Sequence, residues 1–285
     1  MIDSGLKSVT TLFLTLLTFS SVNAIAEYEH PLSSSGVKYT LFQSIGADHR
    51  SAKNIARNPY RHPQQTLEFF GLKPNMTVVE IWPGGGWYSE ILAPVLKDQG
   101  QFYAAGFSLV AKRTPDWRKN YQRKFEAKLK QNPDIYSKTL ITDLSIPERP
   151  DIAPAESADL VLTFRNVHNW MKGKYDQEVF DSMYKALKPR GILGIVEHRA
   201  KPTTNLEDMI QSGYVTEAHV IKLAEKAGFK LLEKSEINAN PKDSTLHPKG
   251  VWTLPPTLRL GEEDKEKYLA IGESDRMTLK FIKLN

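Results

Sequence analysis

The chain has 285 residues, of which 40% are hydrophobic and 25% are charged, and its formal net charge is +5 at neutral pH. This composition provides enough apolar side chains for a folded core and excludes an intrinsically disordered chain. The absence of cysteine excludes disulfides, thiolate metal sites, a cysteine nucleophile and a lipid anchor on cysteine. The seven histidines include no pair at HExxH spacing, so we predict no metal site.

Residues 1–26 have the pattern of a secretory signal peptide. Lys7 precedes an apolar run over 9–19 that is too short to span a bilayer, and small residues follow at Ala24 and Ala26. An uncleaved anchor or an apolar N-terminal helix is the alternative. We predict cleavage and a mature protein that is periplasmic or secreted, with no membrane contact after cleavage.

Residues 27–285 are predicted to form a single domain, which begins with an N-terminal extension over 27–75. Its first part, 27–37, is polar. Two helical segments are expected over 48–57 and 63–70, separated by 58–62, because proline at position 63 suits the first turn of a helix.

The segment 76–92, MTVVEIWPGGGWYSEIL, predicts a buried strand, a glycine turn and the start of a helix. Its β-branched run is typical of a parallel strand buried on both faces, and Glu80 is the only charged residue in that run. The three glycines at 84–86 give the backbone dihedral angles that are closed to other residues. Free N–H groups and the positive end of the helix favour an anionic or carboxylate-bearing ligand above the turn.

Strands and helices alternate through the rest of the core, which we place at 76–237. Strands are predicted over 101–107, 138–142, 158–164, 192–196 and 229–237, and helices over 114–130, 175–187 and 217–226. The helix over 114–130 has a basic side, which is more common as a solvated face than as a nucleic-acid surface. We therefore expect no nucleic-acid partner.

The C-terminal part departs from this alternation. Residues 238–275 contain several prolines and little periodicity, and are predicted to be a long loop or lid. Such a lid would place Trp252 and His247 over a bound ligand. The last strand is expected within 276–285. It can run antiparallel, because no helical crossover precedes it.

The stretches EIWPGGGWY, FRNVHNW and GESDRMTLKF, together with six alternating strands and a returning seventh, resemble class I S-adenosylmethionine-dependent methyltransferases, and most closely a group of exported bacterial members. The resemblance covers about residue 47 to the C-terminus. It implies an α/β fold with a Rossmann-like, seven-stranded, mostly parallel sheet, an antiparallel last strand and helices on both faces. It also implies S-adenosyl-L-methionine as the cofactor.

The resemblance assigns a cofactor site as well. Glu80 matches the acid of the first motif, while Trp82 stands where the class has its first glycine. The second strand has no carboxylate at 105–107, where the class holds the ribose, and Asp143 matches the position near the adenine. The predicted cofactor-binding residues are Glu80, Trp82, Gly84, Gly85, Gly86, Asp143, Arg165 and Asn166. The aromatic residues Trp82, Trp87 and Tyr88 either wall the cofactor or belong to the core.

A general base is needed only when the acceptor loses a proton, because the sulfonium methyl group is already activated and alignment supplies most of the catalysis. His168, after the fourth strand, is the first candidate, since a free imidazole has a pKa of about 6.5. Glu197 and His198, after the fifth strand, are the next candidates. Alternatively, His168 fixes its loop and the other two form a structural cluster with a neighbouring arginine.

The predicted function is S-adenosylmethionine-dependent methyl transfer to a small-molecule or peptide acceptor. A non-catalytic exported ligand-binding protein on the same fold is one alternative, because the space outside the inner membrane has no evident supply of the cofactor. An NAD-dependent oxidoreductase is another, because Gly84, Gly86 and Ser89 approximate GxGxxG. The acceptor and the oligomeric state have no signature in the sequence.

Overall fold

The computed structural model describes residues 1–2 and 39–284. The predicted signal peptide, apart from its first two residues, and the polar segment over 27–37 lie outside the described residues. In the part of the chain that the structure describes, no helix is both long and apolar enough to cross a membrane.

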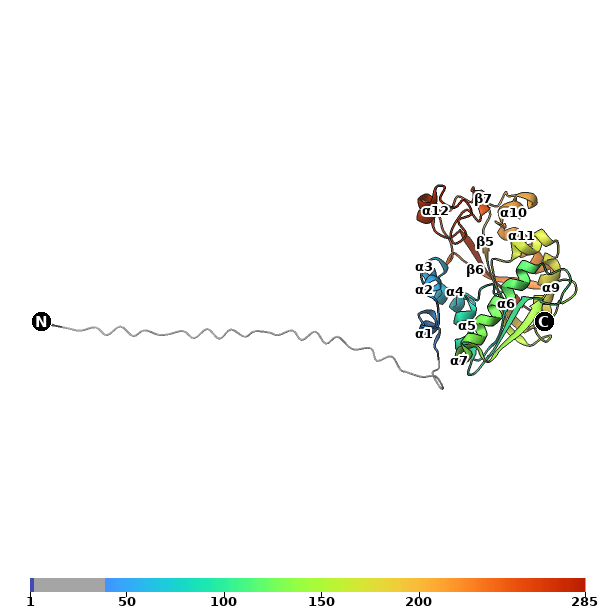
Figure 1. Ribbon diagram of the computed structural model, residues 1–285, viewed down its shortest axis with the longest axis horizontal. Coiled ribbons are helices and arrows are strands. Elements are labelled where there is room, and N and C mark those ends of the chain that lie inside the picture. Colours follow the sequence, from blue (N-terminus) through green and yellow to red (C-terminus); the bar gives the residue numbers. More distant parts are fainter. Residues whose placement is uncertain (3–38, 285) are drawn as a thin grey trace. The chain divides into compact units, whose positions relative to one another are not determined.

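One sheet organises the described residues (Figure 1). The strands are β1 Thr77–Ile81, β2 Gln101–Phe107, β3 Thr139–Leu144, β4 Ala158–Phe164, β5 Leu187–His198, β6 Phe229–Ser235, β7 Pro248–Val251 and β8 Arg276–Lys283. Seven of them form the sheet in the order β3-β2-β1-β4-β5-β8-β6. The pairs from β3 to β5 are parallel, whereas β8 is antiparallel to both β5 and β6. The predicted fold class, with its antiparallel last strand, is confirmed.

Helices cover both faces of this sheet. They are α1 Leu41–Ile45, α2 Ala52–Ile55, α3 Asn58–Arg61, α4 Pro63–Phe69, α5 Ser89–Leu96, α6 Asp116–Gln131, α7 Pro133–Tyr136, α8 Val167–Gly173, α9 Asp176–Ala186, α10 Leu206–Ser212, α11 Glu217–Lys226 and α12 Lys265–Ile271. Leu67, Ile91 and Phe125 bring α4, α5 and α6 onto one face. Phe180 and Val220 bring α9 and α11 onto the other. Burying each such side chain contributes roughly 1.5–3 kcal/mol, so this two-faced core holds the sheet together.

The N-terminal extension differs from the prediction at one point. We expected a break over 58–62, whereas the structure forms α3 there and ends it at His62, whose backbone is left-handed with φ of 41°. The left-handed residue lets α4 begin at once with Pro63 at its first position. The helix α3 thereby places Arg57 and Arg61 beside the glycine turn.

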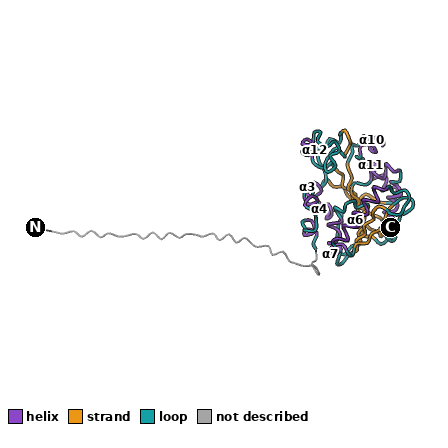
Figure 2. The backbone as a smooth tube through the Cα atoms, in the orientation of Figure 1, coloured by secondary structure: helices purple, strands orange, loops and turns teal. Residues whose placement is uncertain are grey.

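The segment predicted as a long loop or lid contains β7 and α12, with loop between them (Figure 2). Its first part is held by Asp243, which accepts hydrogen bonds from the Tyr214 hydroxyl at 2.9 Å and from the Asp275 N–H at 2.8 Å. His247 pairs with the same carboxylate at 2.8 Å. This anchoring fixes the residues around Trp252 near the carboxyl ends of the strands.

Candidate functional site

Two cavities open at the carboxyl ends of the parallel strands, and Trp82 lines both. The first, called here the arginine cavity, has a volume of about 540 Å³ and is lined by Gly84, Arg61, Arg165 and His198 among others. The second, called the aromatic cavity, has a volume of about 460 Å³ and is lined by residues that include Trp82, Phe107, Trp117, Leu144 and Tyr175. The open edge of the sheet is where α/β folds of this kind bind ligands.

Gly84 and Gly85, the first two glycines of the turn, line the arginine cavity. Gly84 has φ of 62°, and a Cβ atom there would meet only the Tyr121 ring, at 3.5 Å. The N–H groups of Gly84 and Gly85 make no hydrogen bond among the described residues, so they remain for a ligand. Gly86 is outside the cavity lining, and a Cβ atom on it would lie 2.8 Å from the Phe125 ring. Gly86 therefore serves the packing of α6.

Glu80, the last residue but one of β1, lines the arginine cavity. Its carboxyl group accepts a hydrogen bond from the Ser89 hydroxyl, at 2.6 Å, in the first turn of α5. Burial raises the pKa of Glu80 to about 7, and the hydrogen bond from Ser89 opposes that rise. The carboxyl group can therefore be neutral or charged near neutral pH.

Glu197 is fully buried and does not line either cavity. Its carboxylate accepts hydrogen bonds from the backbone N–H groups of Val167, at 2.6 Å, and His198, at 2.8 Å. It also lies 3.0 Å from Nδ1 of His168. Glu197 thus fixes the start of α8 and the orientation of His168, and it is a positioning residue in this geometry.

His168 and His198 both line the arginine cavity, with ring centroids 5.4 Å apart. Both ring nitrogens of His168 have partners, because Nε2 lies 3.0 Å from Nδ2 of Asn169. His198 uses Nδ1, 2.6 Å from the Ser274 hydroxyl, and its Nε2 has no hydrogen bond among the described residues. Burial lowers the pKa of His198 well below its ordinary value, and the positive charges nearby add to this. His198 is therefore a neutral imidazole, and Nε2 carries its lone pair in the tautomer whose Nδ1 donates to Ser274.

One ligand atom from each of His168, Glu197 and His198 lies within 4.8 Å of the others, which is close enough to consider a metal ion. The carboxylate, however, already accepts backbone and imidazole N–H donors, and a metal would have to displace them. Hydrogen bonding therefore accounts for the cluster in full.

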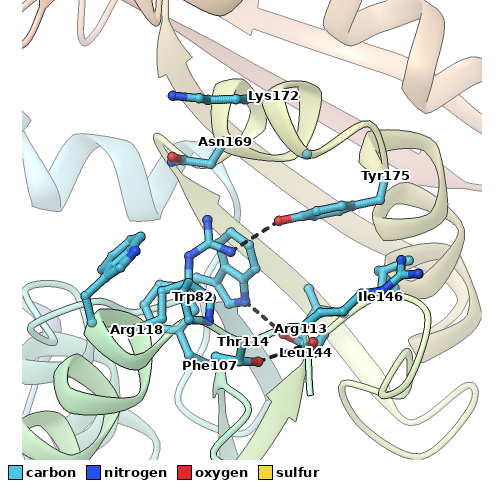
Figure 3. Close-up of a pocket in the computed structure, with 14 residues that line it drawn as sticks. Trp82, Phe107, Arg113, Thr114, Arg118, Leu144, Ile146, Asn169, Lys172 and Tyr175 are labelled. Carbon is cyan, nitrogen blue, oxygen red and sulfur yellow. Dashed lines mark hydrogen bonds between the residues drawn. The ribbon is translucent and has the colours of Figure 1, made fainter. Parts of the chain in front are cut away.

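The aromatic cavity surrounds a guanidinium group (Figure 3). Cζ of Arg118 lies 4.4 Å from the ring centroid of Trp82 and 5.2 Å from that of Phe107. The Trp82 indole is itself fixed, because its Nε1 donates to the Leu144 carbonyl at 3.2 Å and its ring packs 4.8 Å from Phe107. Nη1 of Arg118 donates to the Tyr175 hydroxyl at 3.3 Å, which links α6 to the start of α9.

The remaining predicted residues are divided between the cavity and its surroundings. Arg165 and Asn166 line the arginine cavity, as do Trp87, Tyr88 and Trp252, but His247 does not. Asp143 lines neither cavity and pairs with Arg149 at 3.1 Å. The sequence did not point to Arg57, Arg61 and Glu273, which meet at the cavity wall.

The residues present fit the two ends of S-adenosylmethionine. The N–H groups of Gly84 and Gly85 suit a carboxylate, and Glu80 suits an ammonium group. Stacked rings in the aromatic cavity suit a flat base. Trp82 stands between the two ends, with φ of 46°, at the position that the methyltransferase resemblance gives to a glycine. The two cavities therefore share one indole, that of Trp82, in their linings.

No protein-family model matches the chain, and no curated protein matches it. Solved structures do. A SAM-dependent methyltransferase from Aquifex aeolicus is 15% identical with a TM-score of 0.54, and the match covers 86% of this chain and 100% of that one. A cyclase, SpnF, is also 15% identical with a TM-score of 0.54, covering 85% of this chain and 91% of that one. At such identities the likeness concerns the fold, and the chain has the Rossmann-like fold of class I methyltransferases.

Proposed function

We propose that this chain transfers a methyl group from S-adenosylmethionine to a small molecule bound in the arginine cavity. The observation that carries the proposal is the glycine turn: two N–H groups without partners, at Gly84 and Gly85, border the same cavity as a neutral imidazole, His198. A donor with a carboxylate and an acceptor with a proton to lose would both find partners there.

The cofactor supplies a methyl group that is already activated by its positive sulfur. The chain supplies placement and a proton acceptor. Gly84 and Gly85 hold a carboxylate with their N–H groups, and Glu80 holds a cationic group when its carboxyl is ionised. Ser274 orients the His198 ring through Nδ1, which leaves Nε2 to take the proton of an acceptor hydroxyl, amine or thiol.

The proposal is tested by thermal unfolding of the protein with S-adenosylmethionine, S-adenosylhomocysteine, NAD or no ligand. A ligand present at 100 times its dissociation constant stabilises the folded state by about 2.7 kcal/mol. We expect stabilisation by both sulfur nucleosides and none by NAD. If neither sulfur nucleoside stabilises the protein, the proposal fails, and stabilisation by NAD alone would favour an oxidoreductase.

The variant Gly84→Val is expected to abolish this stabilisation, because a β-branched residue is strained at φ of 62° and its methyl groups enter the cavity. Gly261→Val is the matched control, since Gly261 has φ of 65°, has open space around it and is outside both cavities. Full ligand binding by Gly84→Val would show that the cofactor lies elsewhere.

A binding protein without methyl transfer is the second candidate, and Trp82 favours it. Its indole lines both cavities, where the methyltransferase resemblance has a glycine, and it is held by the Leu144 carbonyl. In that case the arginine cavity would bind an anion while neither sulfur nucleoside stabilised the protein. Export, as predicted from residues 1–26, and a small-molecule or peptide acceptor are further parts of the proposal.

A further inference from the structure

Three arginines share one carboxylate at the wall of the arginine cavity. Glu273 pairs with Nε of Arg57 at 2.7 Å, with Nε of Arg61 at 3.1 Å and with Nη1 of Arg276 at 3.1 Å. Burial alone would raise the pKa of Glu273, but the guanidinium groups, that of Arg61 foremost, lower it to about 2. The carboxylate is therefore ionised, and it supplies a single negative charge.

A fourth guanidinium has no acid of its own. Arg165 follows β4 with a left-handed backbone, φ of 62°, and lines the same cavity. Its side chain makes no hydrogen bond or ion pair with any described residue. Burial lowers its pKa to about 10, which leaves it protonated at neutral pH.

Two of the paired arginines also have buried N–H groups without a partner. Nη1 of Arg61 and Nη2 of Arg57 are buried and have no hydrogen-bond partner. The side chain of Arg61 is only 2% exposed, and it lines the cavity. Buried donors of this kind destabilise a protein unless a ligand or water satisfies them.

The charges around the cavity therefore do not balance. Four guanidinium groups, of Arg57, Arg61, Arg165 and Arg276, accompany one ionised carboxylate, that of Glu273, which leaves three positive charges in excess. Lys53, which also lines the cavity, adds a further positive side chain. The other carboxyl group in the lining belongs to Glu80, which is half ionised at about pH 7. The methionine part of the cofactor carries two positive charges, on its ammonium group and its sulfur, and one negative charge, so it does not remove the excess.

We propose that the methyl acceptor carries a dianionic group, a phosphate or a dicarboxylate, that is held by Arg57, Arg61 and Arg165. Guanidinium groups bind both kinds of oxyanion through paired N–H donors. That this dianion is the methyl acceptor rests on the proposed function, whereas the dianion site itself rests on the unpaired donors and the excess charge alone. The acceptor is then a small anion whose other end lies beside His198.

The test is calorimetric titration of the full chain with inorganic phosphate and with malonate, each in a low-salt buffer, and with sodium chloride as the monoanion. We expect one dianion to bind at least about tenfold more tightly than chloride. Arg165→Gln removes the guanidinium that has no structural partner, so it should fold and lower that affinity about tenfold or more. Arg123→Gln, on the exposed side of α6, is the matched control with unchanged affinity.

Each outcome decides a separate point. Binding of phosphate or malonate that Arg165→Gln weakens supports the site and identifies the oxyanion. Equal binding of chloride and both dianions, or unchanged binding by a folded Arg165→Gln, overturns it. Competition between the dianion and S-adenosylhomocysteine overturns the assignment to the acceptor, because the arginines would then hold the cofactor's carboxylate. Dianion binding without any sulfur-nucleoside binding sinks the proposed function and leaves the anion site standing.

Discussion

The arginine cavity and the aromatic cavity lie at the ends of neighbouring strands, yet they are built in opposite ways. The arginine cavity collects charges from α3, from the end of β4 and from the residues before β8, and it leaves N–H donors without partners. The aromatic cavity is lined mainly by rings, and its guanidinium, that of Arg118, lies over Trp82 and donates to Tyr175 through Nη1, although its Nε has no partner. One cavity is prepared for an anion, whereas the other already holds a cation from its own chain.

The largest effect is expected from Trp82→Gly, which removes the indole that lines both cavities. Loss of a buried tryptophan costs about 3–5 kcal/mol, and relief of the left-handed backbone at φ of 46° returns about 1 kcal/mol. We also expect tighter binding of S-adenosylhomocysteine, because the shared indole is gone. Urea denaturation and ligand titration measure the two effects.

Trp117→Ala is the control for Trp82→Gly, because Trp117 lines the aromatic cavity with 61% of its surface exposed and should change stability by less than about 1 kcal/mol. Weaker binding of the nucleoside by Trp82→Gly would contradict our interpretation. The indole would then be a stacking surface for the ligand rather than an obstacle.

Glu80→Gln tests the arginine cavity by its pH dependence. The folded pKa of about 7 exceeds the ordinary value of 4.5, so the folded state holds the proton more tightly than the unfolded state. The wild-type protein should therefore lose about 3 kcal/mol of stability as the pH rises from 4.5 to 7, and none above that range. Glu80→Gln should remove this loss and be the more stable protein at pH 8.

Denaturation midpoints at pH 4.5 and pH 8 measure the difference. Glu68→Gln, on the exposed side of α4, should leave the pH profile of the wild type unchanged. An equal loss of stability in Glu80→Gln and the wild type would place the titrating group elsewhere.

The smallest effect is expected from Tyr175→Phe. The variant removes the 3.3 Å hydrogen bond from Arg118 at the rim of the aromatic cavity and should cost about 1 kcal/mol or less. Tyr103→Phe is the control, because the Tyr103 hydroxyl has no hydrogen bond among the described residues. Equal unfolding midpoints for the two variants would show that the link between α6 and α9 does not stabilise the folded state.

Local patterns in the sequence predicted most of the fold. Apolar runs marked β1, β2 and β4, and the missing crossover marked β8 as antiparallel. The helix α8 was not predicted, because its start depends on the carboxylate of Glu197, which accepts the Val167 N–H from 30 residues away in sequence. A helix start fixed by a distant residue leaves no local signature.

The candidate site was predicted less well than the fold. The glycine turn, Arg165 and the two histidines are marked by motifs and by their places after strands. The pairing of Arg57 with Glu273 joins residues 216 apart, so no local pattern connects them. The spacing of Arg57 and Arg61, four residues apart, was a usable signal, because such residues share one face of a helix.

The place of β8 in the sheet has a consequence for how this protein is made. Residues 276–283 lie between β5 and β6, so β6 has no strand to pair with, and β5 has only β4 beside it, until β8 has been synthesised. Contacts so distant in sequence form late and slowly. The sheet of a nascent chain therefore stays incomplete until β8 is made, and loss of residues 276–283 would leave β6 unpaired in this sheet.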